Sequence, residues 1–335
     1  MEKVLVVSMT NFWGGGESFI MSHLTNIENI EFYYLVASKE LYSRLNSNAF
    51  LLEDSSVKEF SKKIGEITEK YEIKTVVLNG GRSFFIAPSI FKKNKVVGIR
   101  HTLNNYVNSK YRIPYLFLLN LSCCFMNKIV HVSKASQREQ LFNRKNSLVI
   151  YNGVENRNSE VKEPNKEVVF TYVGRMSCNK GVKILIDAFN EILETEKNIK
   201  LLLVGSGEVD ESYPHHEKIE FLGFYQDVSS FYKNTDYYVS LPNQENCSIA
   251  IIDSLSFGVP VITTDVGGNT ELVINDYNGY IVERNKESVV KTVKNILSFN
   301  SDKYRFLSEN AKNHYEKNFS LDEKKRFYKE LLENL

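Results

Sequence analysis

The stretch PNQENCSIAIIDSLSFGVPVIT, at residues 242–263, predicts a loop, a helix and a strand in that order. A Pro-Asn-Gln turn signal opens it, an apolar run ends at Gly258, and β-branched residues follow. Glu245 lies in the loop, and Asp253 lies inside the apolar run. A buried carboxylate is unfavourable unless something pairs with it. We therefore expect Asp253 to bind ligand hydroxyls; the alternative is that it faces solvent or accepts a bond from a backbone N–H.

On both sides of this stretch, short β-rich runs alternate with helical ones. KVLVVSM, TVVLNGG, VVFTYVGR and IKLLLVGSG are such β-rich runs, and VKILIDAFNEIL is an amphipathic helix. The alternation is typical of a parallel sheet with crossover helices, and the polar residues 155–167 interrupt it. The sequence therefore predicts an α/β fold of two Rossmann-like, doubly wound domains, at residues 1–155 and 165–319, facing a central cleft. A charged helix at 320–335 is expected to join the first domain.

Composition excludes several classes of protein. Hydrophobic residues make up 42% of the 335 residues and charged residues 25%, the balance of a globular protein. A net charge of +1 gives no global attraction to nucleic acid. The four cysteines have no CxxC or metal-ligand spacing, so we expect a reducing compartment. The sequence has no D-x-D motif, so we expect no metal. Residues 113–126 are the most apolar stretch and are too short to span a bilayer, and no signal peptide is recognisable. A cytoplasmic location is expected.

Two loops at predicted strand ends are suited to phosphate. Gly15 and Gly16 stand in GGGE between the first strand and first helix, where backbone N–H groups and the helix dipole attract an anion. The spacing is not GxGxxG, which argues against a nicotinamide site, and a plain turn is the alternative. In VGRMSCNKG, Arg175 follows a strand and Lys180 precedes a helix, an arrangement suited to a diphosphate. The alternative there is two solvated charges.

Several segments together resemble one family of enzymes. DSLSFGVPVITTDVGGNTELV, YVGRMSCNKGVKILIDAF, VIYNGVE, GGGES and HVSKASQREQL resemble, in order, segments of retaining GT-B-fold glycosyltransferases of the family-four (glycosyl transferases group 1) type. These enzymes build bacterial polysaccharides, such as capsule or lipopolysaccharide. Glu245 and Asp253 stand at the two acidic positions of the family's E-x7-E motif. The resemblance covers nearly the whole chain.

The resemblance implies a nucleotide-diphosphate sugar as donor, linked to UDP or GDP, with no cofactor and no metal. Arg175 and Lys180 would neutralise the diphosphate, Glu245 would contact the sugar, and Asp253 would bind the ribose. His101 would contact the donor sugar, although a structural histidine bonded to a loop carbonyl is the alternative. Catalytic roles would thus fall to Glu245, His101, Arg175 and Lys180. The expected donor-contacting residues are Gly15, Gly16, Gly174, Arg175, Lys180, Gly205, Phe224, Glu245, Cys247, Ser248, Ile249 and Asp253.

One departure from the family pattern leaves alternatives open. The second acid of the motif is usually glutamate, and Asp253 is one methylene shorter, so the ribose contact must shift. A nucleotide-sugar 2-epimerase of the same architecture, or a non-catalytic glycosyltransferase-like subunit, are the competing hypotheses. The expected acceptor is a glycan or a polyprenyl-diphosphate-linked sugar.

The charge distribution suggests where such an acceptor would be met. Residues 82–145 contain twelve Lys and Arg but one acid, Glu139. Aromatic and apolar residues interleave with them, as in NYVNSKYRIPYLFLL. This pattern suits an anionic membrane surface on the inner face of the cytoplasmic membrane. The alternative is a solvated basic face, with the apolar side of residues 113–126 at least partly in the core.

Overall fold

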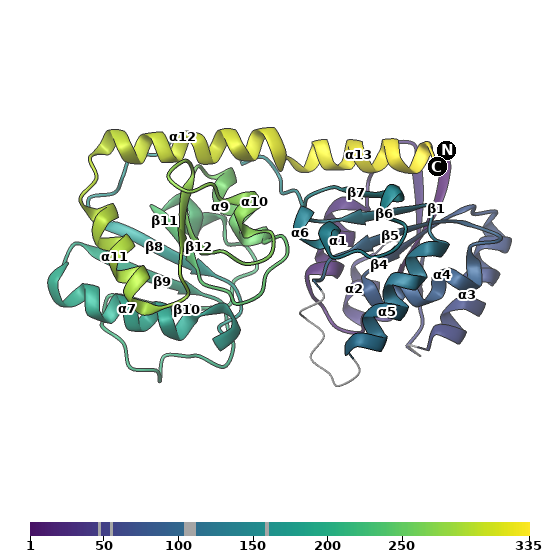
Figure 1. The fold of residues 1–335 in the computed structure, drawn as a ribbon, viewed down its shortest axis with the longest axis horizontal. Helices are drawn as coiled ribbons and strands as arrows, with labels where there is room; N and C mark the ends of the chain where they lie inside the picture. The colour runs from purple at the N-terminus through teal and green to yellow at the C-terminus, as the bar shows by residue number, and fades with distance from the viewer. Residues whose placement is uncertain (46–47, 54–55, 104–111, 158–160) are drawn as a thin grey trace. The chain divides into compact units, whose positions relative to one another are not determined.

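The chain forms two compact units, each with its own sheet (Figure 1). The computed structural model describes residues 1–45, 48–53, 56–103, 112–157 and 161–335. The first unit comprises Met1–Gly153 and Leu321–Leu335, and the second comprises Val154–Ser320. The C-terminal helix thus packs with the first unit, and the division falls just ahead of the polar segment 155–167.

The first unit contains one parallel sheet with the strand order β3-β2-β1-β4-β5-β6-β7 in its described residues. Chain order reverses between β1 and β4, the position where ligands bind at the carboxyl ends of strands in doubly wound folds. The strands are β1 Glu2–Ser8, β2 Ile30–Val36, β3 Ala49–Leu51, β4 Thr75–Asn79, β5 Lys95–Arg100, β6 Lys128–His131 and β7 Ser147–Val149.

Helices cover both faces of this sheet because alternate strand residues point to opposite sides. Along β1, Leu5 and Val7 pack in the core that includes α3 and α5, whereas Val4 and Val6 pack with α1 and α13. The helices are α1 Gly15–His23, α2 Lys39–Arg44, α3 Val57–Tyr71, η1 Gly81–Ile86, α4 Ala87–Ile90, α5 Arg112–Ser122, η3 Cys123–Phe125, α6 Lys134–Arg138, η4 Arg144–Asn146 and α13 Leu321–Glu333.

The second unit repeats the design with the strand order β10-β9-β8-β11-β12-β13 in its described residues, all parallel. Its reversal point lies between β8 and β11. The strands are β8 Val168–Val173, β9 Ile199–Val204, β10 Ile219–Gly223, β11 Tyr237–Ser240, β12 Val261–Thr264 and β13 Gly279–Val282. The helices are η5 Cys178–Lys180, α7 Val182–Thr195, α8 Ser229–Lys233, α9 Ile249–Ser256, α10 Asn269–Leu272, α11 Lys286–Leu297 and α12 Ser301–Asn318.

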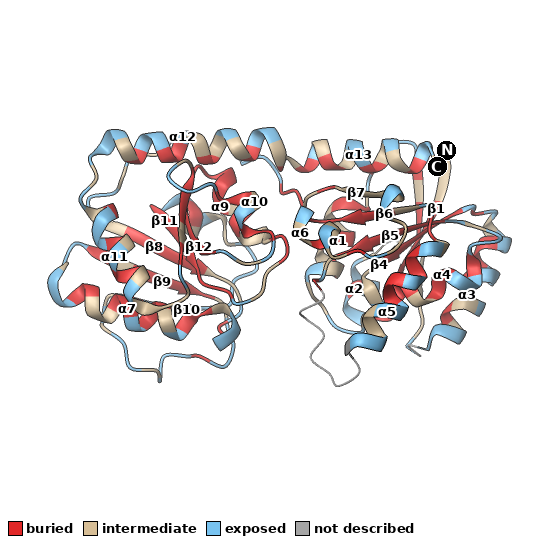
Figure 2. Cartoon of the chain, in the orientation of Figure 1, coloured by how far each residue is buried: buried red, intermediate tan, exposed pale blue. Residues whose placement is uncertain are grey.

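Burial in each unit follows the layers (Figure 2). The strands are largely buried, and helices such as α7 bury one stripe, which includes Leu185, Phe189 and Ile192. Helix α9 ends where the sequence predicted: Gly258 has φ +67°, and its N–H donates to the Leu255 carbonyl. Within the described residues, we find no helix with the length and hydropathy needed to cross a bilayer.

Candidate functional site

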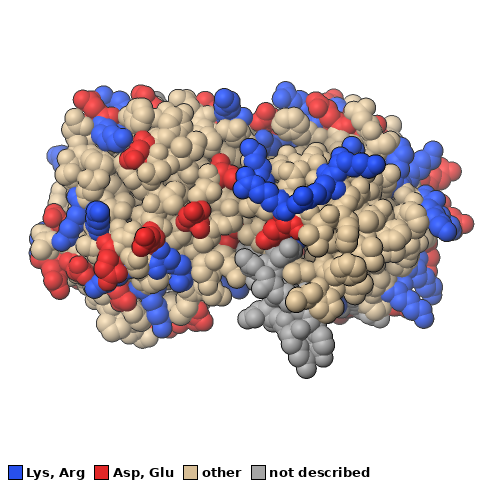
Figure 3. All heavy atoms as spheres, in the orientation of Figure 1, with Lys and Arg blue, Asp and Glu red and all other residues tan. Residues whose placement is uncertain are grey.

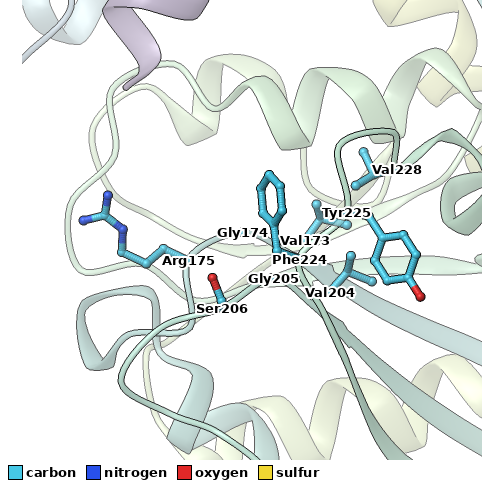
Figure 4. A pocket seen from close by; sticks show the side chains of 9 residues that line it. All are labelled: Val173, Gly174, Arg175, Val204, Gly205, Ser206, Phe224, Tyr225 and Val228. Atoms are coloured by element: carbon cyan, nitrogen blue, oxygen red, sulfur yellow. The ribbon is translucent and has the colours of Figure 1, made fainter. Parts of the chain in front are cut away.

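A pocket of about 300 Å³ opens at the carboxyl ends of β8, β9 and β10 in the second unit (Figure 4). The loops after β8 and β9 meet so closely that a Cβ on Gly205 would lie 1.9 Å from the carbonyl oxygen of Gly174. Gly205 also has φ +141°, so only glycine fits this position. The lining residues are Val173, Gly174, Arg175, Val204, Gly205, Ser206, Phe224, Tyr225 and Val228.

The walls of this pocket combine exposed rings with one cation. Phe224 is 76% exposed and Tyr225 47%, and both follow β10. In Figure 4 the Arg175 guanidinium extends away from these two rings, on the far side of Gly174 and Ser206. The Tyr172 hydroxyl donates to the carbonyl oxygen of Arg175 at 2.6 Å and holds this loop in place. The pocket can therefore accept a planar ring beside the aromatic residues and an anion at Arg175.

Lys180 and Glu245 form a close ion pair beside the same strand ends. Lys180 Nζ lies 2.5 Å from Glu245 Oε2, and both side chains are partly exposed. Glu245 Oε1 also accepts a bond from the Asn246 N–H at 3.1 Å. Gly181 makes the close approach of the two loops possible, because its φ is +74° and a Cβ there would lie 2.3 Å from the Leu241 carbonyl oxygen.

Further bonds hold these two loops together. The Asn243 N–H donates to the Asn179 carbonyl at 2.9 Å. Arg284, which follows β13, donates to the carbonyls of Leu241 at 2.9 Å and Cys178 at 2.5 Å. These hydrogen bonds therefore hold in place the two loops that carry Lys180 and Glu245.

Asp253 lies one turn into α9, where its negative charge is less well compensated than that of Glu245. Its Oδ1 lies 3.6 Å from Arg157 Nη2, too far for a hydrogen bond, and has no hydrogen-bond partner among the described residues. Burial raises the pKa of Asp253 to about 6, and the Arg157 charge opposes that rise. Arg157 also contacts the Phe257 ring, at 5.8 Å. The side chain of Asp253 is 17% exposed, and its buried Oδ1 atom is an acceptor that a ligand hydroxyl can satisfy.

The start of α9 lies between the two acids. Ser248 caps the helix, because its side chain accepts from the N–H of Ile251. Ile249 is the first helical residue, and the buried Cys247 precedes the cap. The backbone of these three residues therefore forms the helix N-terminus, where an anion is favoured.

The first unit holds a separate group of predicted residues at the ends of β1, β4 and β5. His101 Nε2 lies 2.8 Å from Asn79 Oδ1, while Asn79 Nδ2 donates to the Gly16 carbonyl at 3.1 Å. Nε2 therefore carries the proton of the His101 ring. Burial lowers the pKa of His101 to about 4, so the ring is neutral at pH 7. Gly15 and Gly16 are the first two residues of α1, so this helix begins earlier than the sequence predicted.

Glu17, the acid of the GGGE segment, is buried inside the first unit. Glu17 is 2% exposed and accepts a bond from the Ser8 hydroxyl at 3.0 Å. Burial raises the pKa of Glu17. Its position behind the loop indicates that it supports the loop and does not bind an anion.

The structure thus places the predicted residues at five positions. Gly174, Arg175, Gly205 and Phe224 line one pocket, Lys180 pairs with Glu245, and Asp253 faces Arg157. Cys247, Ser248 and Ile249 form the start of α9, and Gly15, Gly16 and His101 lie on the first unit. Sequence reasoning missed Tyr225, Asn79 and Arg157. Arg157 lies in a segment whose composition indicated only a linker, and no local pattern marks its pairing with a residue 96 positions away.

Comparisons with known proteins bear on this arrangement. Residues 154–314 match the family model Glycosyl transferases group 1. An uncharacterized glycosyltransferase of Methanocaldococcus jannaschii is 30% identical over 235 residues, which cover 65% of this chain and 61% of the relative. The capsular polysaccharide biosynthesis glycosyltransferase CapM of Staphylococcus aureus is 28% identical over 165 residues, 47% of this chain and 43% of CapM. The chain thus spans less than two thirds of the length of these relatives.

The fold comparison covers both units. The crystal structure of Anabaena HepE in complex with UDP superposes with a TM-score of 0.85 at 17% identity, over 100% of each chain. The two parallel sheets confirm the predicted GT-B class of α/β fold. Residues 154–314 thus match the family that the motifs predicted, the glycosyl transferases group 1.

Proposed function

We propose that the chain is a retaining glycosyltransferase that moves a sugar from a nucleotide-diphosphate sugar to a glycan or lipid-linked acceptor. The observation that carries this proposal is the pairing of Lys180 with Glu245 at 2.5 Å, on loops next to the Arg175 pocket. Cations for a diphosphate and an acid for a sugar thus occur at the carboxyl ends of neighbouring strands, where doubly wound sheets bind ligands.

The donor would lie across the second unit. The base would enter the pocket beside Phe224 and the Gly205 backbone, and the diphosphate would lie at Arg175 and Lys180. Asp253 Oδ1 would accept a bond from a ribose hydroxyl, which would satisfy its missing partner. The α9 N-terminus at Cys247, Ser248 and Ile249 would contact the phosphate or the sugar.

Catalysis would be mainly electrostatic. When the bond between the sugar and the phosphate breaks, negative charge builds on the departing diphosphate, and Arg175 and Lys180 stabilise it. Glu245 would bond the sugar and steady positive charge at its anomeric carbon once Lys180 has turned to the phosphate. His101, with its Nε2 proton held by Asn79, would donate no proton there and would position the sugar. We assign no protein nucleophile.

Because Arg175 and Lys180 supply the positive charge, we propose that turnover needs no divalent cation. Turnover that is unchanged after treatment with a chelator is the expected result. Loss of turnover that added Mg²⁺ or Mn²⁺ restores would contradict this part of the proposal.

The names of similar proteins support the donor and the setting. HepE was solved with UDP, and CapM is named for capsular polysaccharide biosynthesis. We therefore propose a UDP-linked sugar as the donor, with a GDP-linked sugar as the alternative. We also propose a role in the synthesis of a cell-surface polysaccharide. A cytoplasmic location, where nucleotide sugars are made, follows from this proposal.

The test is a thermal-shift screen of nucleotide sugars, followed by release of free nucleoside diphosphate from the best ligand. A transferase releases it in quantity only when an acceptor is present. An epimerase would change the sugar without an acceptor, and a non-catalytic subunit would bind the donor and release nothing. Binding of no nucleotide sugar at all would contradict the proposal.

A further inference from the structure

An apolar face of α5 lies exposed on the first unit. Ile113, Phe117, Leu118 and Leu121 are 81%, 51%, 52% and 40% exposed, and their spacing places them on one side of the helix. Leu119, on the opposite side, is buried in the core. A helix that is apolar all round is normally buried, so the exposed side of α5 indicates a partner surface.

Neighbouring segments enlarge this face. Leu141 is 60% exposed, and its N–H donates to Asn120 Oδ1 on α5 at 2.9 Å. The ring of Phe142 lies 5.8 Å from that of Phe117. At the end of the helix, the exposed Phe91 packs on Phe125 of η3 at 4.9 Å. The exposed apolar side chains therefore extend from α5 to the segments on either side of it; we call them, with α5, the α5 surface.

Cations border the α5 surface. Figure 3 shows Lys and Arg in a band over α6 and η4, next to an uncharged area over α5. Arg144 is held in this border, because it donates to the carbonyls of Gln140 at 2.6 Å and Arg138 at 2.8 Å. The exposed cations of the border include Lys134, Arg138, Arg144 and Lys145 on α6 and η4, together with Lys92 and Lys93, which follow Phe91 in the chain.

Some cations of the basic stretch 82–145 are not available to bind at the surface. Arg100 is 1% exposed and lies 3.8 Å from Glu139, so it cannot act at a surface. Lys95 bonds the carbonyl of Leu335. Lys110 lies outside the described residues, as does the side chain of Arg112. Since Glu139 is the one acid of the stretch and faces Arg100, the border is positive.

We propose that the α5 surface docks on an anionic lipid bilayer, with its apolar side chains in the interfacial region and its cations among the headgroups. An apolar face bordered by Lys and Arg is the pattern of interfacial membrane binding. A second copy of the chain fits less well, because two positive borders would face each other. The inference rests on the proposed function only in one respect: a lipid-linked acceptor would lie in the same bilayer.

The test is co-sedimentation of the full chain with phosphatidylcholine vesicles and with vesicles that also contain phosphatidylglycerol, at low and high salt. We expect binding to the anionic vesicles that high salt weakens. The triple variant Lys92→Gln/Lys93→Gln/Lys145→Gln should lose about fivefold in affinity per cation. The variant Ile113→Gln/Leu118→Gln should lose roughly tenfold or more.

Matched controls come from the second unit. Lys291→Gln/Lys294→Gln removes exposed cations of α11, and Ile274→Gln/Phe306→Gln removes exposed apolar side chains. We expect both control proteins to bind vesicles as the unchanged protein does. Equal losses in controls and test variants would overturn the assignment of the α5 surface.

Two further outcomes would overturn the proposal. One is equal sedimentation with both kinds of vesicle, or with neither. The other is a dimer in solution that Ile113→Gln/Leu118→Gln converts to monomer. Nucleotide binding, measured by calorimetry on the same proteins, separates this inference from the proposed function. We expect all α5-surface variants to bind nucleoside diphosphate normally and Arg175→Ala to bind vesicles normally, so either part can fail alone.

Discussion

The surroundings of Glu245 and Asp253 differ, although both acids follow β11 in one short stretch. Glu245 contacts a lysine directly at 2.5 Å, so its charge is compensated without a ligand. Asp253 lies 3.6 Å from an arginine, has an oxygen without a hydrogen bond, and has its pKa raised by burial. The two acids therefore have different roles: Glu245 must give up a partner to contact a ligand, whereas Asp253 gains one.

The largest effect should come from Glu245→Gln. The amide keeps the size of the side chain but loses the charge that would steady the sugar in the transition state. We expect turnover to fall by roughly 10²–10³, the range for loss of one electrostatic contact. Nucleoside diphosphate affinity should stay within a few-fold, as measured by calorimetry. An unchanged rate with weakened binding would reverse the roles of Glu245 and Asp253.

The cations should matter next. Arg175→Ala or Lys180→Ala should weaken nucleoside diphosphate binding by about 1.5–3 kcal/mol, because hydrogen bonds to charged groups are of that size. Lys183→Ala is the matched control, since Lys183 is an exposed lysine on α7 near Lys180 in the chain. Normal binding by both test variants would mean that the diphosphate lies elsewhere.

Asp253 should give nucleotide binding a pH dependence. As pH falls through about 6, Asp253 takes up a proton and loses its capacity as a charged acceptor for ribose. We expect affinity for nucleoside diphosphate to fall severalfold between pH 7.5 and about pH 5 in the unchanged protein. Asp253→Asn should bind more weakly at pH 7.5 and show a flat profile. The same pH profile in the variant would exclude Asp253 as its source.

The free energy of unfolding should depend on Asp253 in the opposite direction to nucleotide affinity. The folded protein holds the Asp253 proton more tightly than the unfolded chain, whose pKa is near 3.8, so Asp253 lowers the free energy of unfolding as pH rises from about 4 to 6. Asp253→Asn should therefore raise that free energy by about 1–2 kcal/mol at pH 7.5 and leave it unchanged near pH 4. Urea denaturation at the two pH values measures this, and an equal change at both would contradict it.

The smallest effect should come from Arg157→Gln. The Arg157 charge holds down the pKa of Asp253, so its loss should move the midpoint of the pH profile upward by less than about one unit. The change is small because the two groups are 3.6 Å apart and Arg157 is partly exposed. A downward shift would show that Arg157 does not act on Asp253 by its charge.

Much of the fold follows from local sequence. The four β-rich runs quoted from the sequence became β1, β4, β8 and β9, and Gly258 ends α9, because β-branched runs and glycine have strong local preferences. Three short strands, β3, β10 and β13, were not predicted. Each lies at an edge of its sheet, so its formation depends on pairing with a single neighbouring strand.

The sequence predicted which residues belong to the candidate site better than it predicted which side chains they contact. Arg175 and Lys180 stand at strand and helix ends, where a motif can mark them. The cation that faces Asp253 is Arg157. The two residues are far apart in the sequence, so only the tertiary fold brings them together. The sequence also did not show which side of α5 is exposed. A helix that is apolar on both sides has no polar stripe to mark the side that faces solvent.

A crystal structure of the chain with a nucleoside diphosphate would show directly whether the donor binds at Arg175, Lys180 and Asp253. We expect the diphosphate oxygens to lie within hydrogen-bond distance of Arg175 and Lys180, the base to enter the pocket beside Phe224, and Asp253 to contact the ribose. A nucleotide bound away from these residues, with the ion pair of Lys180 and Glu245 unchanged, would contradict this expectation.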